Sequence, residues 1–375
     1  MQNPVFMEVL PQRYAELDWL RVILIVAVFM HHVFMPFNGD NWHIMNNESS
    51  KLLDDIMVYF EQLRLPVLFL IAGAGSVILL NRISSKAFLL SKSKRLLLPL
   101  LLAMMFITPP QAYFEAPEQY ASLLDAYQQR LLIFDNKHLW FIEFLIIFML
   151  LAIPLKKALD TSPGQSLLET IEKLSHRPFG LMLSGVVLVS VRCFFKLYYP
   201  EQDGAIENLS VSVFYLVFFI SGMLFMSRQA IWQSVARHRR VNLYGFIVSS
   251  LVFYIYYLGD FSSIGSLAVR WQIWWALTAL LSWSGMLVLL GYARHYLNNS
   301  PAWLRQANEL IYPFYILHQT VIVVLAYYIV QWDAGIALKS LTVLVLAFTL
   351  TAGLCYFVIR PAAWLRLAFG LKQRA

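Results

Sequence analysis

The residues of this chain best suited to chemistry are an arginine and a histidine that share one apolar stretch. Residues 17–37 form a run of membrane-helix length, with Arg21 near its start and His32 near its end. Charged and titratable side chains are costly inside a membrane and usually mark a site or a pathway. Each helical residue turns by roughly 100°, so Arg21 and His32 point about 20° apart and lie roughly 16 Å apart along the axis, whereas His31 points about 80° away. The spacing therefore predicts one helix face with a cation near one membrane surface and an imidazole nearer the other.

Two interpretations of this pair stay open at the level of sequence. An imidazole titrates near neutrality, so His32 suits proton transfer as a general base. The guanidinium of Arg21 can bind a phosphate through two parallel hydrogen bonds. Alternatively, Asp18 and Arg21 form an interfacial pair that reaches the lipid headgroups, while His31 and His32 hydrogen-bond to neighbouring helices.

Further polar side chains stand at the expected outer ends of two other apolar runs. Glu61 and Arg64 are three residues apart, which fits either a helix-end ion pair or part of a site. His138 precedes the second of these runs. Glu143 lies one turn inside it, where a carboxylate needs a partner such as Arg64 or His32.

Two more features have both a structural and a functional interpretation. His318 lies roughly 13 Å deep in its apolar run, either as a packing residue or as part of a site. Residues 81–95 carry five cations around an apolar centre, which suits lipid headgroups or the phosphates of a nucleotide-like donor. The cations assigned to such a donor site are Arg21, Arg82, Lys94 and Arg95.

The composition indicates a membrane protein. Of the 375 residues 59% are hydrophobic and 14% are charged, and the mean hydropathy is +0.61. The net charge of +7 does not indicate nucleic-acid binding, because the basic residues form short clusters between apolar segments. Cys193 and Cys355 fall inside predicted spans without metal-ligand spacing, and the sequence has no Gly-rich phosphate loop or serine nucleophile motif. We therefore expect no disulfide, no metal and no permanently bound cofactor.

Apolar runs of about 20 residues predict an all-α polytopic protein with ten membrane helices, in which residues 1–375 form a single membrane domain. Of the 29 Lys and Arg residues, 20 fall in segments assigned to the cytoplasm, six in outer loops and three within spans. This bias places both termini in the cytoplasm. We expect the first run to remain as a helix, because it is too long and too acidic at its start for a cleavable signal peptide. The predicted spans are 17–37, 59–80, 96–114, 139–155, 179–197, 209–227, 241–259, 271–292, 309–330 and 338–359, and prolines interrupt the third.

Five sequence blocks in one order resemble the membrane acyltransferase-3 family, which includes bacterial sugar O-acyltransferases and a relative that succinylates periplasmic glucans. The blocks are LDWLR followed by ten residues and His32, then RLPVLFLIAG, SKSKRLLLPLL, HLWFIEFL and YPFYILHQ. The resemblance covers nearly the whole chain, and it maps the family's arginine and histidine onto Arg21 and His32. Glu143 follows Trp140 by three residues instead of the five found in the sugar O-acetyltransferase branch.

The resemblance implies that cytoplasmic acyl-CoA is the co-substrate and that an extracytoplasmic hydroxyl, often on a carbohydrate, receives the acyl group. It also implies a bacterial inner membrane. Together with the residues, it predicts that Arg21 and the basic cluster hold the CoA phosphates. A pantetheine arm of the order of 15–20 Å then matches the roughly 16 Å rise from Arg21 to His32 along one wet passage.

Four further side chains are given supporting roles in this mechanism: Glu143 or Glu61 to orient the imidazole of His32, and Arg64 or His138 to stabilise the oxyanion. A proton-coupled transporter or exporter remains the alternative, with His32, Glu143 and His318 as its proton relay. The sequence does not specify the acyl group, the acceptor or the oligomeric state.

Overall fold

Ten helices of membrane-spanning length make up most of the part of the chain that the structure describes. The computed structural model describes residues 14–200 and 205–373, and its ten long apolar helices match the predicted spans in order and place. The prediction of an all-α polytopic membrane protein is confirmed. Arg13 and Arg374, two of the cations counted above, lie outside the described residues. The spans are α1 Ala15–Asn38, α2 Lys51–Leu80, α3 to α5 Ser85–Glu115, η3 with α7 Lys137–Leu159, α9 with α10 Gly180–Tyr198, α11 Leu209–Ser227, α13 Arg239–Leu258, α14 Leu267–Tyr296, α15 Ala302–Ile329 and α16 with η4 Ile336–Ile359.

Two spans differ from their predicted form for local reasons. α2 begins at Lys51 rather than at residue 59, because the Ser50 side chain accepts a hydrogen bond from Leu53 N and starts the helix before the apolar run. In the third span, three prolines, Pro99, Pro109 and Pro110, lie at the start of new helical pieces, where a missing N–H group costs little. The pieces are α3 (Ser85–Lys92), η1 (Ser93–Leu97), α4 (Leu98–Phe106) and α5 (Pro109–Glu115).

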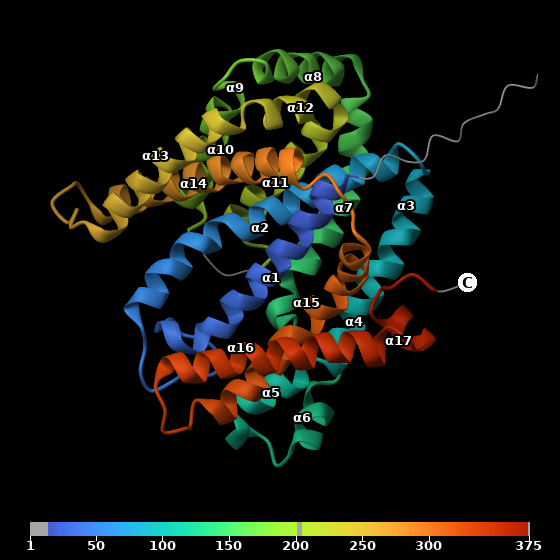
Figure 1. The fold of residues 1–375 in the computed structure, drawn as a ribbon, viewed down its shortest axis with the longest axis vertical. Coiled ribbons are helices and arrows are strands. Elements are labelled where there is room, and N and C mark those ends of the chain that lie inside the picture. Colours follow the sequence, from blue (N-terminus) through green and yellow to red (C-terminus); the bar gives the residue numbers. More distant parts are fainter. Residues whose placement is uncertain (1–13, 201–204, 374–375) are drawn as a thin grey trace, which may run out of the picture.

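Short helices occupy several of the connections (Figure 1). The connection after the fourth span holds α8, Ser162–Ser175, in a segment where a short interfacial helix is expected. It packs against α12, Gln229–Arg237, which fills the connection after the sixth span. The others are η2 (Pro117–Gln119), α6 (Leu123–Arg130) and α17 (Ala363–Ala368).

α1 and α15 lie side by side and run in the same direction. Near their starts, Arg21 Nη1 donates to Asn308 Oδ1 at 3.2 Å. Further along both helices, His32 Nδ1 lies 2.8 Å from His318 Nε2. The two contacts keep nearly the same register, so the face of α1 that carries Arg21 and His32 is turned toward α15 along its length.

α2 is held against α11 by direct contact between the two backbones. A Cβ atom at Gly73 would lie 1.9 Å from the carbonyl oxygen of Phe219, and one at Gly222 would lie 2.0 Å from that of Leu70. Small residues at such crossings allow close helix packing in membranes. Gly75, by contrast, has open space where a Cβ would stand, because it faces the cavity described next.

Candidate active site

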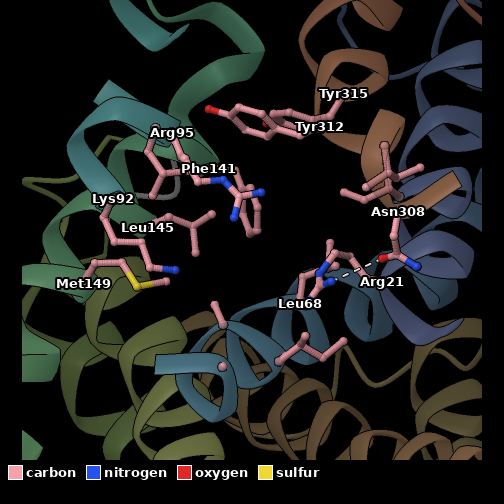
Figure 2. Close-up of a pocket in the computed structure, with 16 residues that line it drawn as sticks. Arg21, Leu68, Lys92, Arg95, Phe141, Leu145, Met149, Asn308, Tyr312 and Tyr315 are labelled. Carbon is pink, nitrogen blue, oxygen red and sulfur yellow. Dashed lines mark hydrogen bonds between the residues drawn. The ribbon is translucent and has the colours of Figure 1, made fainter. Parts of the chain in front are cut away.

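A cavity of about 270 Å³ lies between α1, α2, α7 and α15, on the side where α1 and α15 begin. Figure 2 shows Arg21 on one side of this inner cavity and Lys92 and Arg95 on the other. Much of the remaining wall is apolar and includes Leu68 and Met149. The inner cavity therefore combines three positive charges with an apolar lining.

Arg21 is positioned from two sides. Its Nη1 donates to Asp18 Oδ1 at 3.1 Å and to Asn308 Oδ1 at 3.2 Å. Asn308 Nδ2 in turn donates to the backbone carbonyl of Asp18 at 3.1 Å. The interfacial pair with Asp18 thus exists, and it leaves the guanidinium in the wall of the inner cavity.

The predicted donor-site cations divide into two groups. Arg21 and Arg95 line the inner cavity, whereas Arg82 and Lys94 do not belong to its wall. Lys92 takes their place. Lys92 and Arg95 are three residues apart and share one helix face, while Lys94 points elsewhere and Arg82 lies in the turn between α2 and α3.

His32 and His318 form a hydrogen-bonded pair with a defined direction. His318 Nδ1 lies 2.5 Å from the carbonyl oxygen of Tyr315, and a carbonyl oxygen only accepts. His318 Nδ1 therefore carries the proton, and its Nε2 is the acceptor in the neutral ring. His32 Nδ1, 2.8 Å away, must donate to that nitrogen. This leaves Nε2 of His32 unprotonated, as a general base requires.

Both ring nitrogens of His138, which lies beside the pair, take part in contacts of their own. Its Nε2 donates to the carbonyl of Ile316 at 3.1 Å, and its Nδ1 lies 3.3 Å from Gln111 Nε2. The Tyr315 hydroxyl also donates to the backbone carbonyl of His138 at 2.5 Å. With both ring nitrogens engaged, His138 has no donor left for an oxyanion, which contradicts that predicted role.

The imidazole of His32 is oriented by His318 and not by a carboxylate. Glu143 Oε2 accepts a hydrogen bond from Asn136 Nδ2 at 2.7 Å, at the start of α7. Glu61 is exposed and lines a different cavity. In the described part of the chain, neither Glu143 nor Glu61 is hydrogen-bonded to His32, and His318 lies at Nδ1 in their place.

Two aromatic rings, Tyr315 and Phe141, stand between the inner cavity and the histidine pair. Both line the cavity, whereas His32 does not. The Tyr315 ring packs 5.5 Å from that of His318 and 5.8 Å from that of Phe141, measured between ring centroids. We call these two rings the aromatic partition. Arg21 therefore lines the inner cavity and His32 does not, although both residues share the helix face that the spacing predicts.

A second cavity, of about 600 Å³, is lined by Arg64, Glu61 and Arg192. Asp40, two residues beyond the end of α1, also lies in the wall of this cavity. We call this cavity the outer cleft, because its residues lie toward the ends of spans assigned to the outer face.

Two site residues, Asn308 and Gln111, escaped the sequence analysis, and the first had a detectable signal, because polar Tyr312, Tyr315 and Gln319 follow it along the same helix. A polar stripe runs along one face of α15, with residues at spacings of four, three and four: Asn308, Tyr312, Tyr315 and Gln319. Gln111 had none. The break before α5 places it beside His138 and α15, where its Nε2 also donates to Thr320 Oγ1 at 2.6 Å.

Comparisons with known proteins show the family of this chain. Residues 14–360 match a family model described as an acyltransferase domain. Glucans biosynthesis protein C of Escherichia coli strain K12 is 26% identical over 231 residues, and the proteins of that name from Salmonella heidelberg and Salmonella typhi are 27% identical over 227. Each alignment covers 57% of this chain and 58% of the relative, so the match spans little more than half the length of those proteins. No solved structure matches this chain.

Proposed function

The chain belongs to the acyltransferase-3 family, and from this premise we propose that it is a membrane-bound O-acyltransferase of the bacterial inner membrane. It moves an acyl group from cytoplasmic acyl-CoA to a hydroxyl group on the far side of the membrane. The acceptor is a carbohydrate, in keeping with the glucan named in its relatives. The observation that carries the proposal is the hydrogen-bond chain that leaves Nε2 of His32 unprotonated.

The inner cavity suits the donor. Arg21, Lys92 and Arg95 supply the positive charge that CoA phosphates need, and guanidinium groups bind phosphate oxygens in pairs. The apolar wall suits a pantetheine arm. At about 270 Å³ the cavity is smaller than most sites for whole ligands, so the arm enters while the nucleotide stays at the inner surface.

The acyl transfer needs no reactant besides donor and acceptor. The acceptor hydroxyl gives its proton to Nε2 of His32 while its oxygen bonds to the thioester carbonyl carbon. The tetrahedral intermediate then breaks its carbon–sulfur bond, and the CoA sulfur takes the proton back from His32. The products are an ester and the CoA thiol. His318 supports this step because its Nε2 accepts the hydrogen bond from Nδ1 of His32 and so stabilises that ring as it becomes positive.

Arg64 is the candidate for stabilising the oxyanion. Its Nε is buried and has no hydrogen-bond partner among the described residues. A positive donor that is already in place before the reaction stabilises developing negative charge without reorganisation. Since His138 is occupied, Arg64 keeps the role that the sequence analysis left open between them.

The aromatic partition must open during the reaction. Tyr315 and Phe141 line the cavity proposed for the donor and His32 does not, so in this mechanism the thioester reaches the base only when these rings move apart. Motions that bring reacting groups together commonly occur in the microsecond to millisecond range and set many turnover rates.

The proposal is tested with the purified chain in lipid vesicles that have acyl-CoA on one side and glucan oligomers on the other. We expect release of CoA thiol and an acyl-sized mass increase of the glucan by mass spectrometry. His32→Ala should abolish both signals and His31→Ala should retain much of them. Equal loss in the two variants would contradict the choice of His32, and intact thioester with a moving proton gradient would favour a transporter.

A further inference from the structure

We infer that the outer cleft is the binding site of the carbohydrate acceptor and that it holds a chain of several sugar residues. This inference rests on the proposed function, since the acceptor hydroxyl must reach His32. It is argued from the aromatic rings, the charged groups and the shape of the cleft.

Tryptophan side chains face the outer cleft rather than only lipid. At the ends of membrane helices tryptophan usually anchors the helix in the headgroup region. Here the rings share a cavity wall with arginine, lysine and glutamate side chains. Sugar rings have apolar C–H faces that stack on flat aromatic rings, while their hydroxyl edges need polar partners. The tryptophans are Trp140, Trp271, Trp274 and Trp275.

The polar groups of the cleft include donors and acceptors that sugar hydroxyls can use. The Arg192 guanidinium lies 4.2 Å from the ring centroid of Phe214 and 4.9 Å from that of Trp275, so it is held flat between them. Its Nε and that of Arg64 are buried and have no hydrogen-bond partner within the described residues. Glu61 adds carboxylate oxygens, which accept hydrogen bonds from hydroxyl groups.

A third cavity adjoins the outer cleft along the turn between α13 and α14. It measures about 390 Å³ and shares Tyr257, Trp271 and Trp274 with the cleft. Asp260 lies in its wall, and hydrogen bonds from Ser262 hold the pKa of this carboxyl below its ordinary value. It is therefore ionised near neutral pH and accepts hydrogen bonds. Two adjoining cavities with one continuous aromatic wall fit a chain better than a single sugar.

The cleft also leads to the proposed base. Arg64 lines it together with Asp40, which follows the end of α1, the helix that carries His32. A sugar beside Arg64 therefore presents its hydroxyl to His32, while the rest of the chain runs past Trp274 toward Trp271.

The test is a binding series with linear glucose oligomers of one to eight residues, in α- and β-linked forms, measured by calorimetry on the purified chain without acyl-CoA. Affinity should rise with length. Trp271→Ala should weaken binding of the longest oligomers by about five- to tenfold and leave the shortest unchanged, and Trp271→Phe should restore most of the loss. Trp332→Ala is the matched control, because Trp332 lies in another outer connection and is 46% exposed against 45% for Trp271. It should change nothing.

The inference is overturned if affinity does not depend on length, or if Trp271→Ala and Trp332→Ala have the same effect. Failure of the proposed function gives a different result. In that case wild-type protein binds the oligomers in this length-dependent way, yet transfers no acyl group when acyl-CoA is added. In a working transferase, the Trp271→Ala variant should raise KM for long acceptors only and keep kcat and the KM for acyl-CoA.

Discussion

Replacing His318 with alanine is the sharpest perturbation of the proposed chemistry. The change removes the acceptor that holds the Nδ1 proton of His32 at 2.8 Å. His32 is then free to carry its proton on Nε2 instead, the nitrogen that must be bare to act as a base. The reaction loses its prepared base without losing the imidazole itself.

The size of the effect follows from the bond that is lost. A buried donor left without its partner costs about 1–3 kcal/mol, and each 1.4 kcal/mol corresponds to about a factor of ten in rate. We therefore expect kcat to fall by about 10- to 100-fold. The loss is smaller than the roughly 10⁴-fold found when an ionised aspartate is removed from a serine-protease triad, because His318 is a neutral partner. KM for acyl-CoA should stay the same, since His318 does not line the inner cavity.

The assay is CoA thiol release at saturating donor and acceptor. His318→Gln should recover part of kcat, because an amide oxygen also accepts a hydrogen bond. His318 is 1% exposed, so the melting midpoint of each variant is measured alongside. Unchanged kcat in a folded His318→Ala variant would refute the pairing.

Other predictions concern the inner cavity and the helix packing. Gly75→Leu should fill the inner cavity and raise KM for acyl-CoA at least about tenfold. Gly75→Ala should leave KM unchanged, because a Cβ there meets no atom within 4 Å. Donor titrations of the two variants measure the difference. Gly73→Ala should destabilise the fold by about 1–3 kcal/mol, because its Cβ would lie 1.9 Å from the Phe219 carbonyl oxygen; thermal unfolding in detergent measures this, with Gly75→Ala as control. Glu16→Gln should lower the free energy of unfolding by about 2–3 kcal/mol and leave KM unchanged. The change removes the counter-ion of Arg294, which pairs with Glu16 at 2.6 Å. The same unfolding assay measures this loss, and an unchanged melting midpoint would contradict the prediction.

The helices were predictable because the membrane makes length and hydropathy decisive. Runs of about 20 apolar residues must be helices when no water is present to satisfy the backbone, so all ten spans could be placed. Their ends were less predictable. The Ser50 cap extends α2 into a polar segment that hydropathy assigns to a loop, and the prolines of the third span indicated a break without showing its form.

The site was predictable only along single helices. The 100° rule correctly put Arg21 and His32 on one face, and the same rule applied to α15 would have found the stripe that ends at Gln319. Which helix lies beside which is not a local property. The partner of His32 Nδ1 is 286 residues away, so the sequence analysis assigned a carboxylate, Glu143 or Glu61, by analogy with other catalytic histidines, where the fold supplies His318.

The aromatic partition has a consequence for the cell that houses this protein. Chambers that enter a bilayer from opposite sides would, if joined, form a leak for ions and protons. In the proposed function, Tyr315 and Phe141 would have to separate the two aqueous sides whenever no transfer takes place, so that ions and protons do not cross. The same two rings would then keep a bound thioester from His32 until the acceptor hydroxyl is present, which limits hydrolysis.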